Sequence, residues 1–194
     1  MPTLVMLHGM TGTAQMMESF AENILPEGWS LLTPQAEFPH PQRGFTWWHF
    51  KGDGDPNRSS LTSNELANVD SSVLKVVESL PDDDIVIGGF SQGGAIAMEI
   101  LQFPIASKVM GVIAISTRII RPLELRIRLK ELPLNNLLWM HGESDSLIPI
   151  QSGEEIAELF MQENWEVTKI SHSRGHMIPI EFHNKMKDWL GKIA

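Results

Sequence analysis

One serine of this chain stands in a setting that would make it a nucleophile. Ser91 lies in the sequence Gly89-Phe90-Ser91-Gln92-Gly93, between an apolar run at residues 85–88 and a helix-like stretch at residues 95–101. A serine in a sharp turn from a strand into a helix presents its hydroxyl at the end of the strand, and flanking glycines avoid the collisions that side chains would make there. The pattern predicts attack by Ser91 on acyl carbonyl groups. The alternative is an ordinary serine in a glycine-rich loop.

A nucleophilic serine needs a general base, and the base needs an acid that orients it. Asp145 lies in a polar loop that follows an apolar, strand-like run, and it is the candidate acid. His176 lies in the loop after the next strand-like segment, and it is the candidate base. Glu143 is a less well placed rival to Asp145. The chain order of serine, aspartate and histidine is that of a catalytic triad on a strand-turn-helix scaffold.

Four sequence blocks extend this pattern from the first predicted strand to the last predicted helix. They are Leu7-His8-Gly9-Met10, Gly89-Phe90-Ser91-Gln92-Gly93-Gly94, His141-Gly142-Glu143-Ser144-Asp145-Ser146-Leu147-Ile148-Pro149 and Gly175-His176-Met177-Ile178. In these blocks the chain resembles the phospholipase/carboxylesterase family of α/β-hydrolases, which includes small carboxylesterases and acyl-protein thioesterases. The resemblance implies spatial strand order 2-1-3-4-5-6, without the two antiparallel strands that begin larger α/β-hydrolases.

Acyl transfer also needs backbone N–H groups that stabilise the oxyanion of the tetrahedral intermediate. Gln92 follows the nucleophile directly and supplies one such N–H group. The second is expected from the glycine-containing loop at residues 8–12. The resemblance assigns it to Met10, and the N–H of Thr11 is the neighbouring alternative.

A long segment at residues 34–60 is rich in proline, glycine and aromatic residues. Loops of this length in a small domain are usually functional or flexible. Relatives that resemble this chain carry an aromatic residue near the active site in the equivalent loop, and Trp48 is our choice for a substrate-binding residue. Simple packing of the aromatic rings onto the sheet is the alternative.

Residues 116–133 depart from the short loop that is usual in the family. Leucine and isoleucine alternate with charged residues from Leu123 to Lys130, which favours a half-buried extended segment, an added strand or a lid. Five of the 15 basic residues lie between Arg118 and Lys130. A solvated face is the favoured interpretation of these charges. The alternatives are an anion-attracting rim and an edge, Ser116 to Pro133, that pairs in a homodimer.

Strand-like and helix-like segments alternate along the chain, which predicts a mostly parallel sheet with helices on both faces. Six strands are expected near residues 3–7, 30–33, 84–88, 109–115, 137–141 and 167–171. Helices are expected near residues 14–23, 63–80, 92–103, 151–164 and 180–193. Together with this pattern, the resemblance implies one minimal α/β-hydrolase domain over residues 1–194.

Composition narrows the classes of function. The 194 residues suffice for one domain with a substantial core, and a net charge of −9 argues against nucleic acid as the main partner. The absence of cysteine excludes thiol catalysis and disulfides. No apolar run is long enough for a membrane span and no signal peptide precedes the first strand, so a cytoplasmic location is expected.

These observations predict a serine hydrolase that cleaves a small-molecule carboxylic ester, or a thioester, through an acyl-enzyme on Ser91, with no metal and no organic cofactor. Acyl transfer to another acceptor and C–C bond hydrolysis by the same triad are alternatives, because fold and triad do not set the substrate. A non-catalytic ligand-binding module with this fold is a further alternative.

Overall fold

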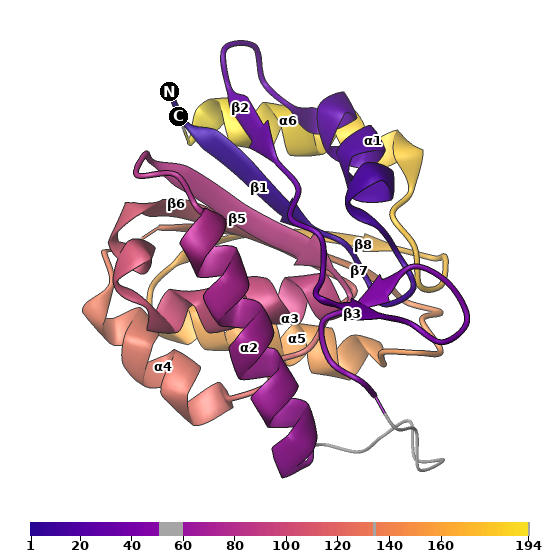
Figure 1. The fold of residues 1–194 in the computed structure, drawn as a ribbon. Helices are drawn as coiled ribbons and strands as arrows, with labels where there is room; N and C mark the ends of the chain where they lie inside the picture. The colour runs from indigo at the N-terminus through magenta and orange to yellow at the C-terminus, as the bar shows by residue number, and fades with distance from the viewer. Residues whose placement is uncertain (51–59, 134, 194) are drawn as a thin grey trace.

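A six-stranded parallel sheet forms the centre of the molecule (Figure 1). The computed structural model describes residues 1–50, 60–133 and 135–193. The strands are β1 (Thr3–Leu7), β2 (Ser30–Leu32), β5 (Ile85–Phe90), β6 (Val109–Ile115), β7 (Asn136–Gly142) and β8 (Glu166–His172). Their spatial order, β2-β1-β5-β6-β7-β8, confirms the order 2-1-3-4-5-6 that the resemblance implies. All five pairings are parallel, so the carboxyl ends of the strands meet at one edge.

Helices cover both faces of the sheet, as expected (Figure 1). They are α1 (Ala14–Ile24), α2 (Ser63–Ser79), α3 (Gln92–Glu99), α4 (Pro122–Glu131), α5 (Ile150–Gln162) and α6 (His183–Lys192). Short 3₁₀ helices lie at η1 (Ile100–Gln102), η2 (Pro104–Lys108) and η3 (Ile180–Phe182). One apolar cluster joins α2, α3, α4 and α5 to the sheet, and the other joins α1 and α6 to its opposite face.

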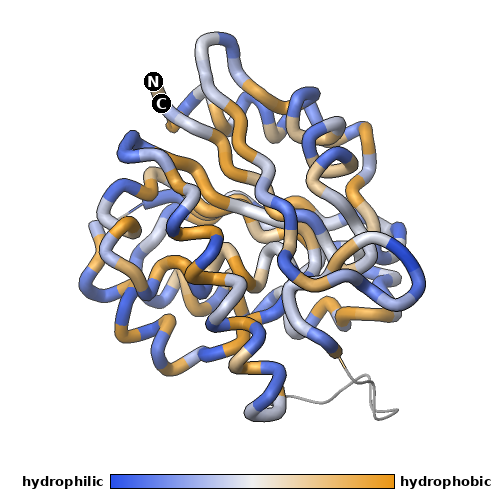
Figure 2. Tube along the Cα trace, viewed as in Figure 1, coloured by the Kyte–Doolittle hydropathy of each residue, from blue (hydrophilic) through white to orange (hydrophobic). Residues whose placement is uncertain are grey.

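The strands show why the sheet is buried on both faces. In β1, Val5 and Leu7 belong to the first apolar cluster, and Leu4 and Met6 belong to the second. Successive side chains of a strand point to opposite faces, so a continuous apolar run is needed where helices cover both. Apolar residues accordingly follow the central strands in Figure 2.

Residues 122–131 form helix α4, so the expectation of an extended segment there is wrong. Pro122 starts the helix, where a missing N–H costs nothing. Leu125 and Leu129, four residues apart, are buried on one face, whereas Leu123 and Ile127 are 74% and 62% exposed. The alternation in the sequence is therefore two helical faces and not the two faces of a strand. Homodimer formation through residues 116–133 stays a prediction. It could not use strand pairing at residues 122–131, because these residues form a helix.

The aromatic segment contains a small antiparallel pair, β3 (Phe38–Pro39) and β4 (Phe45–Thr46), which the sequence did not predict. An isolated bridge joins Phe45 to Gly12 in the loop after β1. Part of this predicted loop, residues 51–59, lies outside the described residues.

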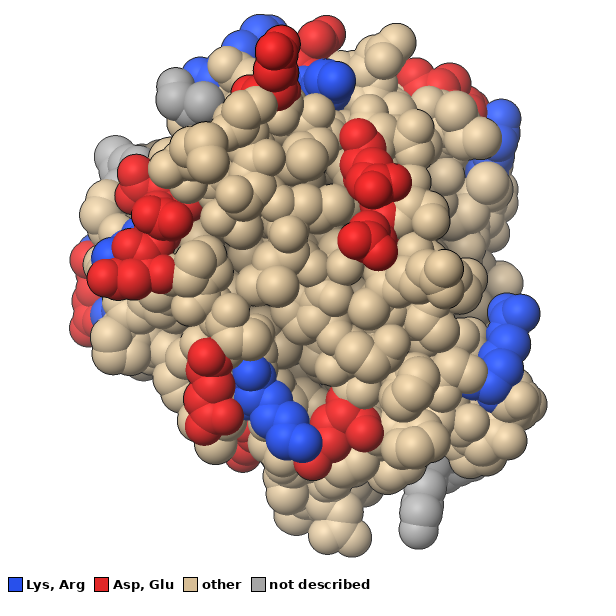
Figure 3. All heavy atoms as spheres, turned by 45° about the horizontal axis from the view of Figure 1, so that its top comes forward, with Lys and Arg blue, Asp and Glu red and all other residues tan. Residues whose placement is uncertain are grey.

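The surface charges are dispersed on the face shown in Figure 3. Basic side chains stand there singly or beside acidic ones, and uncharged surface separates the groups. Within the three described ranges, no helix combines the length and the apolar character needed to cross a membrane.

Candidate active site

Ser91 forms the turn between β5 and α3, at the carboxyl edge of the sheet. Its backbone has φ 54° and ψ −120°, a sparsely populated conformation for a residue with a side chain. A Cβ atom at Gly93 would overlap the carbonyl oxygens of Leu7 and His8, so the motif needs glycine there for close approach to β1. The Ser91 N–H donates to Ile115 O at 2.9 Å. These contacts hold the serine in its strained turn.

Asp145 lies in the loop after β7 and is buried. Its Oδ1 accepts the N–H groups of Leu147 and Ile148, each at 2.9 Å. Its Oδ2 accepts Nδ1–H of His176 at 2.7 Å. Burial raises the pKa of Asp145, but the hydrogen bonds from Ile148 and His176 outweigh burial, so the pKa lies below its ordinary value. The carboxylate is thus kept ionised beside the imidazole.

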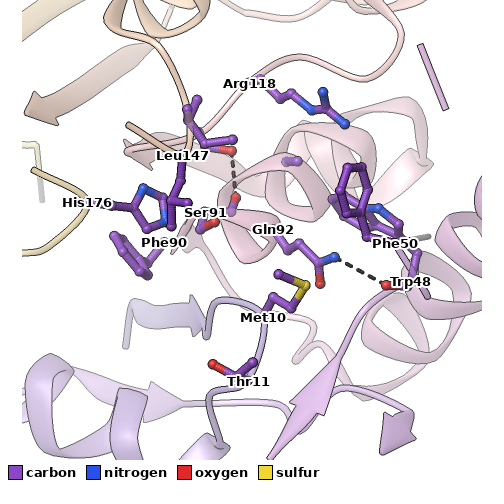
Figure 4. Close-up of a pocket in the computed structure, with 13 residues that line it drawn as sticks. Met10, Thr11, Trp48, Phe50, Phe90, Ser91, Gln92, Arg118, Leu147 and His176 are labelled. Atoms are coloured by element: carbon purple, nitrogen blue, oxygen red, sulfur yellow. Dashed lines mark hydrogen bonds between the residues drawn. The ribbon is translucent and has the colours of Figure 1, made fainter. Parts of the chain in front are cut away.

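His176 lies in the loop after β8 and lines the same cavity as Ser91, beside which it lies in Figure 4. Because Nδ1 donates to the carboxylate, the neutral ring carries its lone pair on Nε2, as a general base requires. The ring packs on Phe90 with a centroid distance of 4.6 Å. Glu143, the rival acid, is exposed to solvent. The structure therefore brings Ser91, Asp145 and His176 together.

Two predicted oxyanion donors also meet at this cavity. Met10 and Gln92 both line it (Figure 4). Gln92 is the first residue of α3, where the N–H group has no partner within the helix. The N–H of Thr11 instead donates to Phe45 O at 2.9 Å, which removes Thr11 as the alternative donor. Met10 and Gln92 remain our assignment.

The Gln92 side chain has a role that the sequence did not predict. Its Oε1 lies within hydrogen-bond distance of Thr46 Oγ1 (2.8 Å) and accepts the N–H of Trp47 (3.0 Å). Its Nε2 donates to Trp48 O at 3.2 Å (Figure 4). The residue after the nucleophile therefore also holds the aromatic segment in place. No local signal could have shown these partners, because they lie 44 to 46 residues away.

His8 braces the loop that carries Met10. Its Nδ1 donates to Gly9 O at 2.8 Å, because Nε2 must accept the N–H of Ala36 at 3.1 Å. Nε2 also lies 2.8 Å from Nε2 of Gln35, which donates to it. Burial lowers the pKa of His8 despite the opposing bond to Gly9. A neutral imidazole thus ties the loop after β1 to the segment after β2.

The cavity has a volume of about 460 Å³ and a mainly apolar wall. It is lined by Met10, Thr11, Trp48, Phe50, Phe90, Ser91, Gln92, Ala95, Thr117, Arg118, Leu147, Ile148 and His176. Trp48 is thus among the lining residues, although its side chain is also almost wholly buried (3% exposed). An apolar wall with a few convergent polar groups is typical of a small-molecule site.

Several basic side chains in and next to α4 form ion pairs within the fold. Arg121 pairs with buried Glu99 and with Asp70 at 2.7 Å. Burial raises the pKa of Glu99, and the pairing with Arg121 opposes that rise. Arg128 pairs with Glu131 at 3.0 Å. Arg118 alone of the five lines the cavity. Arg128 also donates its Nε–H to Leu101 O at 2.9 Å, and Arg126 pairs with Glu163 at 3.6 Å, so these two side chains tie α4 to its surroundings.

A triad-like arrangement at the carboxyl edge of a parallel sheet is typical of α/β-hydrolases. A family model described as Phospholipase/Carboxylesterase matches residues 1–194. The chain therefore belongs to the phospholipase/carboxylesterase family. Within the described residues, no group of three or more His, Asp or Glu side chains is placed to hold a metal ion.

Curated relatives and solved structures agree with this family. Acyl-protein thioesterase 1 of Cryptococcus neoformans is 33% identical over 104 residues, which are 50% of this chain and 41% of that protein. A homologue of acyl-protein thioesterase 1 from Dictyostelium discoideum is 29% identical over 56% of this chain and 50% of its own length. The matched region thus covers half or less of the length of these relatives.

Among solved structures, esterase PE8 matches with a TM-score of 0.80 at 20% identity. The match covers 100% of this chain and 93% of the esterase PE8 chain. Acyl-protein thioesterase 2 of Zea mays matches with a TM-score of 0.73 at 19% identity. The match covers 99% of this chain and 93% of the Zea mays chain. At these identities the likeness concerns the fold.

Proposed function

We propose that this protein is a serine hydrolase that cleaves carboxylic esters through an acyl-enzyme on Ser91, as a single domain over residues 1–194. The observation that carries the proposal is the 2.7 Å hydrogen bond from His176 Nδ1 to Asp145, beside a serine in a strained turn at the same cavity. This combination orients the imidazole with its free nitrogen available to the serine.

In the proposed reaction, His176 Nε2 takes the proton of Ser91 as Oγ attacks the carbonyl carbon. Asp145 holds the required tautomer and stabilises the imidazolium. The N–H groups of Met10 and Gln92 stabilise the oxyanion. His176 then gives its proton to the leaving alcohol or thiol, and water hydrolyses the acyl-enzyme by the same steps.

The cavity and the relatives support the proposed substrate class. The apolar wall suits an uncharged acyl group, and the relatives named acyl-protein thioesterase support thioesters as further substrates. Acyl transfer to another acceptor and C–C hydrolysis use the same triad, and product analysis with an added alcohol or a β-diketone substrate distinguishes them.

The proposal is tested with p-nitrophenyl esters and acyl thioesters of graded chain length, together with a fluorophosphonate probe. We expect hydrolysis by the wild type, covalent labelling that peptide mapping assigns to Ser91, and loss of both in Ser91→Ala. The loss in kcat is expected at about 10³- to 10⁶-fold. Labelling of Ser116 or Ser144 with full activity in Ser91→Ala would exclude the assignment.

A further inference from the structure

A second histidine, His141, lies behind the proposed acid. It stands near the end of β7 and is fully buried. Its ring stacks on Trp139, with a centroid distance of 5.9 Å and an interplanar angle of 23°. It also meets Gly153 of α5, where a Cβ atom would overlap Nδ1 of the ring. Close packing against Trp139 and Gly153 therefore restricts the position of the buried ring.

The hydrogen bonds of His141 define its tautomer. Its Nε2 lies 2.9 Å from Ile148 O. A carbonyl oxygen only accepts, so Nε2 carries the proton. The Nδ1 atom has no hydrogen-bond partner in the described part of the chain. Burial lowers the pKa of His141, so the ring stays neutral with its single N–H directed at the loop after β7.

This N–H group closes the turn that carries Asp145. Ile148 donates its N–H to Asp145 Oδ1 at 2.9 Å and offers its carbonyl oxygen to His141 at 2.9 Å. Both sides of one residue are thus fixed, one by the acid and one by the buried ring. The same Nε2 lies 3.5 Å from Asp145 Oδ2, the oxygen that His176 contacts. The orientation of the carboxylate therefore depends on a turn that His141 holds.

The turn also forms part of the cavity wall. Leu147 and Ile148 both line the cavity (Figure 4 labels Leu147). A shift of this turn would move the acid and the wall together.

We infer that His141 is a positioning residue, which holds the turn from Asp145 to Ile148 so that the carboxylate meets Nδ1 of His176. The inference rests on the proposed function for its effect on rate. Its effect on the hydrogen bond between Asp145 and His176 can be measured without any substrate.

A matched pair of variants separates this role from simple packing. His141→Phe removes the donor and keeps a planar ring. His172→Phe makes the same exchange at another buried histidine, near the end of β8, whose two ring nitrogens have no hydrogen-bond partner in the described residues. The ring of His172 lies 6.1 Å from that of Phe182. Any general cost of replacing a buried imidazole appears in both variants.

We expect kcat for a short ester to fall about 10- to 100-fold in His141→Phe, since a misplacement of about 1 Å costs on the order of 10²-fold. KM should change less than kcat. His172→Phe should stay within about threefold of wild type. In NMR spectra, the low-field proton of the bond between His176 and Asp145 should shift or vanish in His141→Phe and persist in His172→Phe.

A second pair covers the case in which His141→Phe does not fold. His141→Gln retains a donor that can reach Ile148 O, and His141→Met has a similar size without one. We expect kcat to be at least about tenfold higher in His141→Gln than in His141→Met. Equal kcat and an unchanged low-field proton across folded donor and non-donor variants would overturn the inference. If the wild type lacks esterase activity, the proposed function fails, and the NMR comparison still decides the positioning role.

Discussion

Replacing Ser91 by glycine should leave the protein more stable than replacing it by alanine, although both changes remove the hydroxyl. The reason is the backbone of Ser91, with φ 54° and ψ −120°. Glycine has no Cβ atom and enters such conformations at little steric cost. Alanine keeps the Cβ atom and therefore keeps the strain. The comparison isolates the strain from the loss of the nucleophile.

The magnitude follows from two opposing contributions. A residue held in a sparsely populated backbone region costs on the order of 1–3 kcal/mol. Glycine loses more conformational freedom on folding, which costs roughly 0.5–1 kcal/mol relative to alanine. The difference is about 1 kcal/mol in favour of Ser91→Gly. For a domain of this size, that corresponds to about 2–4 °C in Tm.

Urea unfolding followed by the fluorescence of the six tryptophans measures this difference. Ser19, exposed on α1, is the matched control. There the order should reverse, with Ser19→Gly about 1 kcal/mol less stable than Ser19→Ala, because glycine is a poor helix former. A Ser91→Gly variant that is less stable than Ser91→Ala, with the control behaving as expected, would refute strain at this turn.

Three further predictions concern the acid, the cavity wall and pH. Asp145→Asn should lower kcat about 10⁴-fold by allowing the wrong tautomer of His176, whereas Glu143→Gln, at an exposed position, should stay within about threefold; the reverse order in folded variants would move the acid to Glu143. Trp48→Phe should change the ratio of kcat/KM between short and longer acyl esters, because each methylene in an apolar pocket is worth about 1–3 kcal/mol. An unchanged ratio with a lower Tm would make Trp48 a packing residue alone. Stability should fall when pH is lowered from 7.5 to 6.0, because the pKa values of buried His8 and His141 are lowered while imidazoles of the unfolded chain titrate near about 6.5. The unfolded state then binds more protons, at a cost that approaches about 1.4 kcal/mol per pH unit for each histidine. A urea midpoint that stays constant or rises as the pH is lowered from 7.5 to 6.0 would contradict lowered pKa values for His8 and His141.

The strands, and the positions of the candidate site residues after them, could be predicted because their sequence signals are local. The bounds of β1 and β6 agree with the predicted ranges, since a strand buried on both faces is an apolar run that ends where polar residues begin. Ser91, Asp145 and His176 each follow a strand of one parallel sheet. Residues at such positions meet at one edge of the sheet, so their proximity follows from the topology.

Helix α4 could not be predicted from its pattern. The alternation of Leu123, Leu125, Ile127 and Leu129 with charged residues fits a strand with one buried face. The same sequence pattern is compatible with a helix when only two of these four side chains face the core, as Leu125 and Leu129 do. Contacts from outside the segment decide between the two, including the pairing of Arg121 with Glu99 on α3. Tertiary contacts therefore override the local pattern here.

The choice of oxyanion donor was open for the same physical reason. Met10 and Thr11 are neighbours in one loop, and nothing in their local sequence distinguishes their N–H groups. The bond from Thr11 to Phe45 removes one of them, and Phe45 is held in turn by its own N–H bond to Gly12. Gln92 then ties the next residues of that segment to the start of α3. The loop after β1, the turn at Ser91 and the aromatic segment are therefore joined by hydrogen bonds, so substitutions in the aromatic segment should affect rate as well as acyl selectivity.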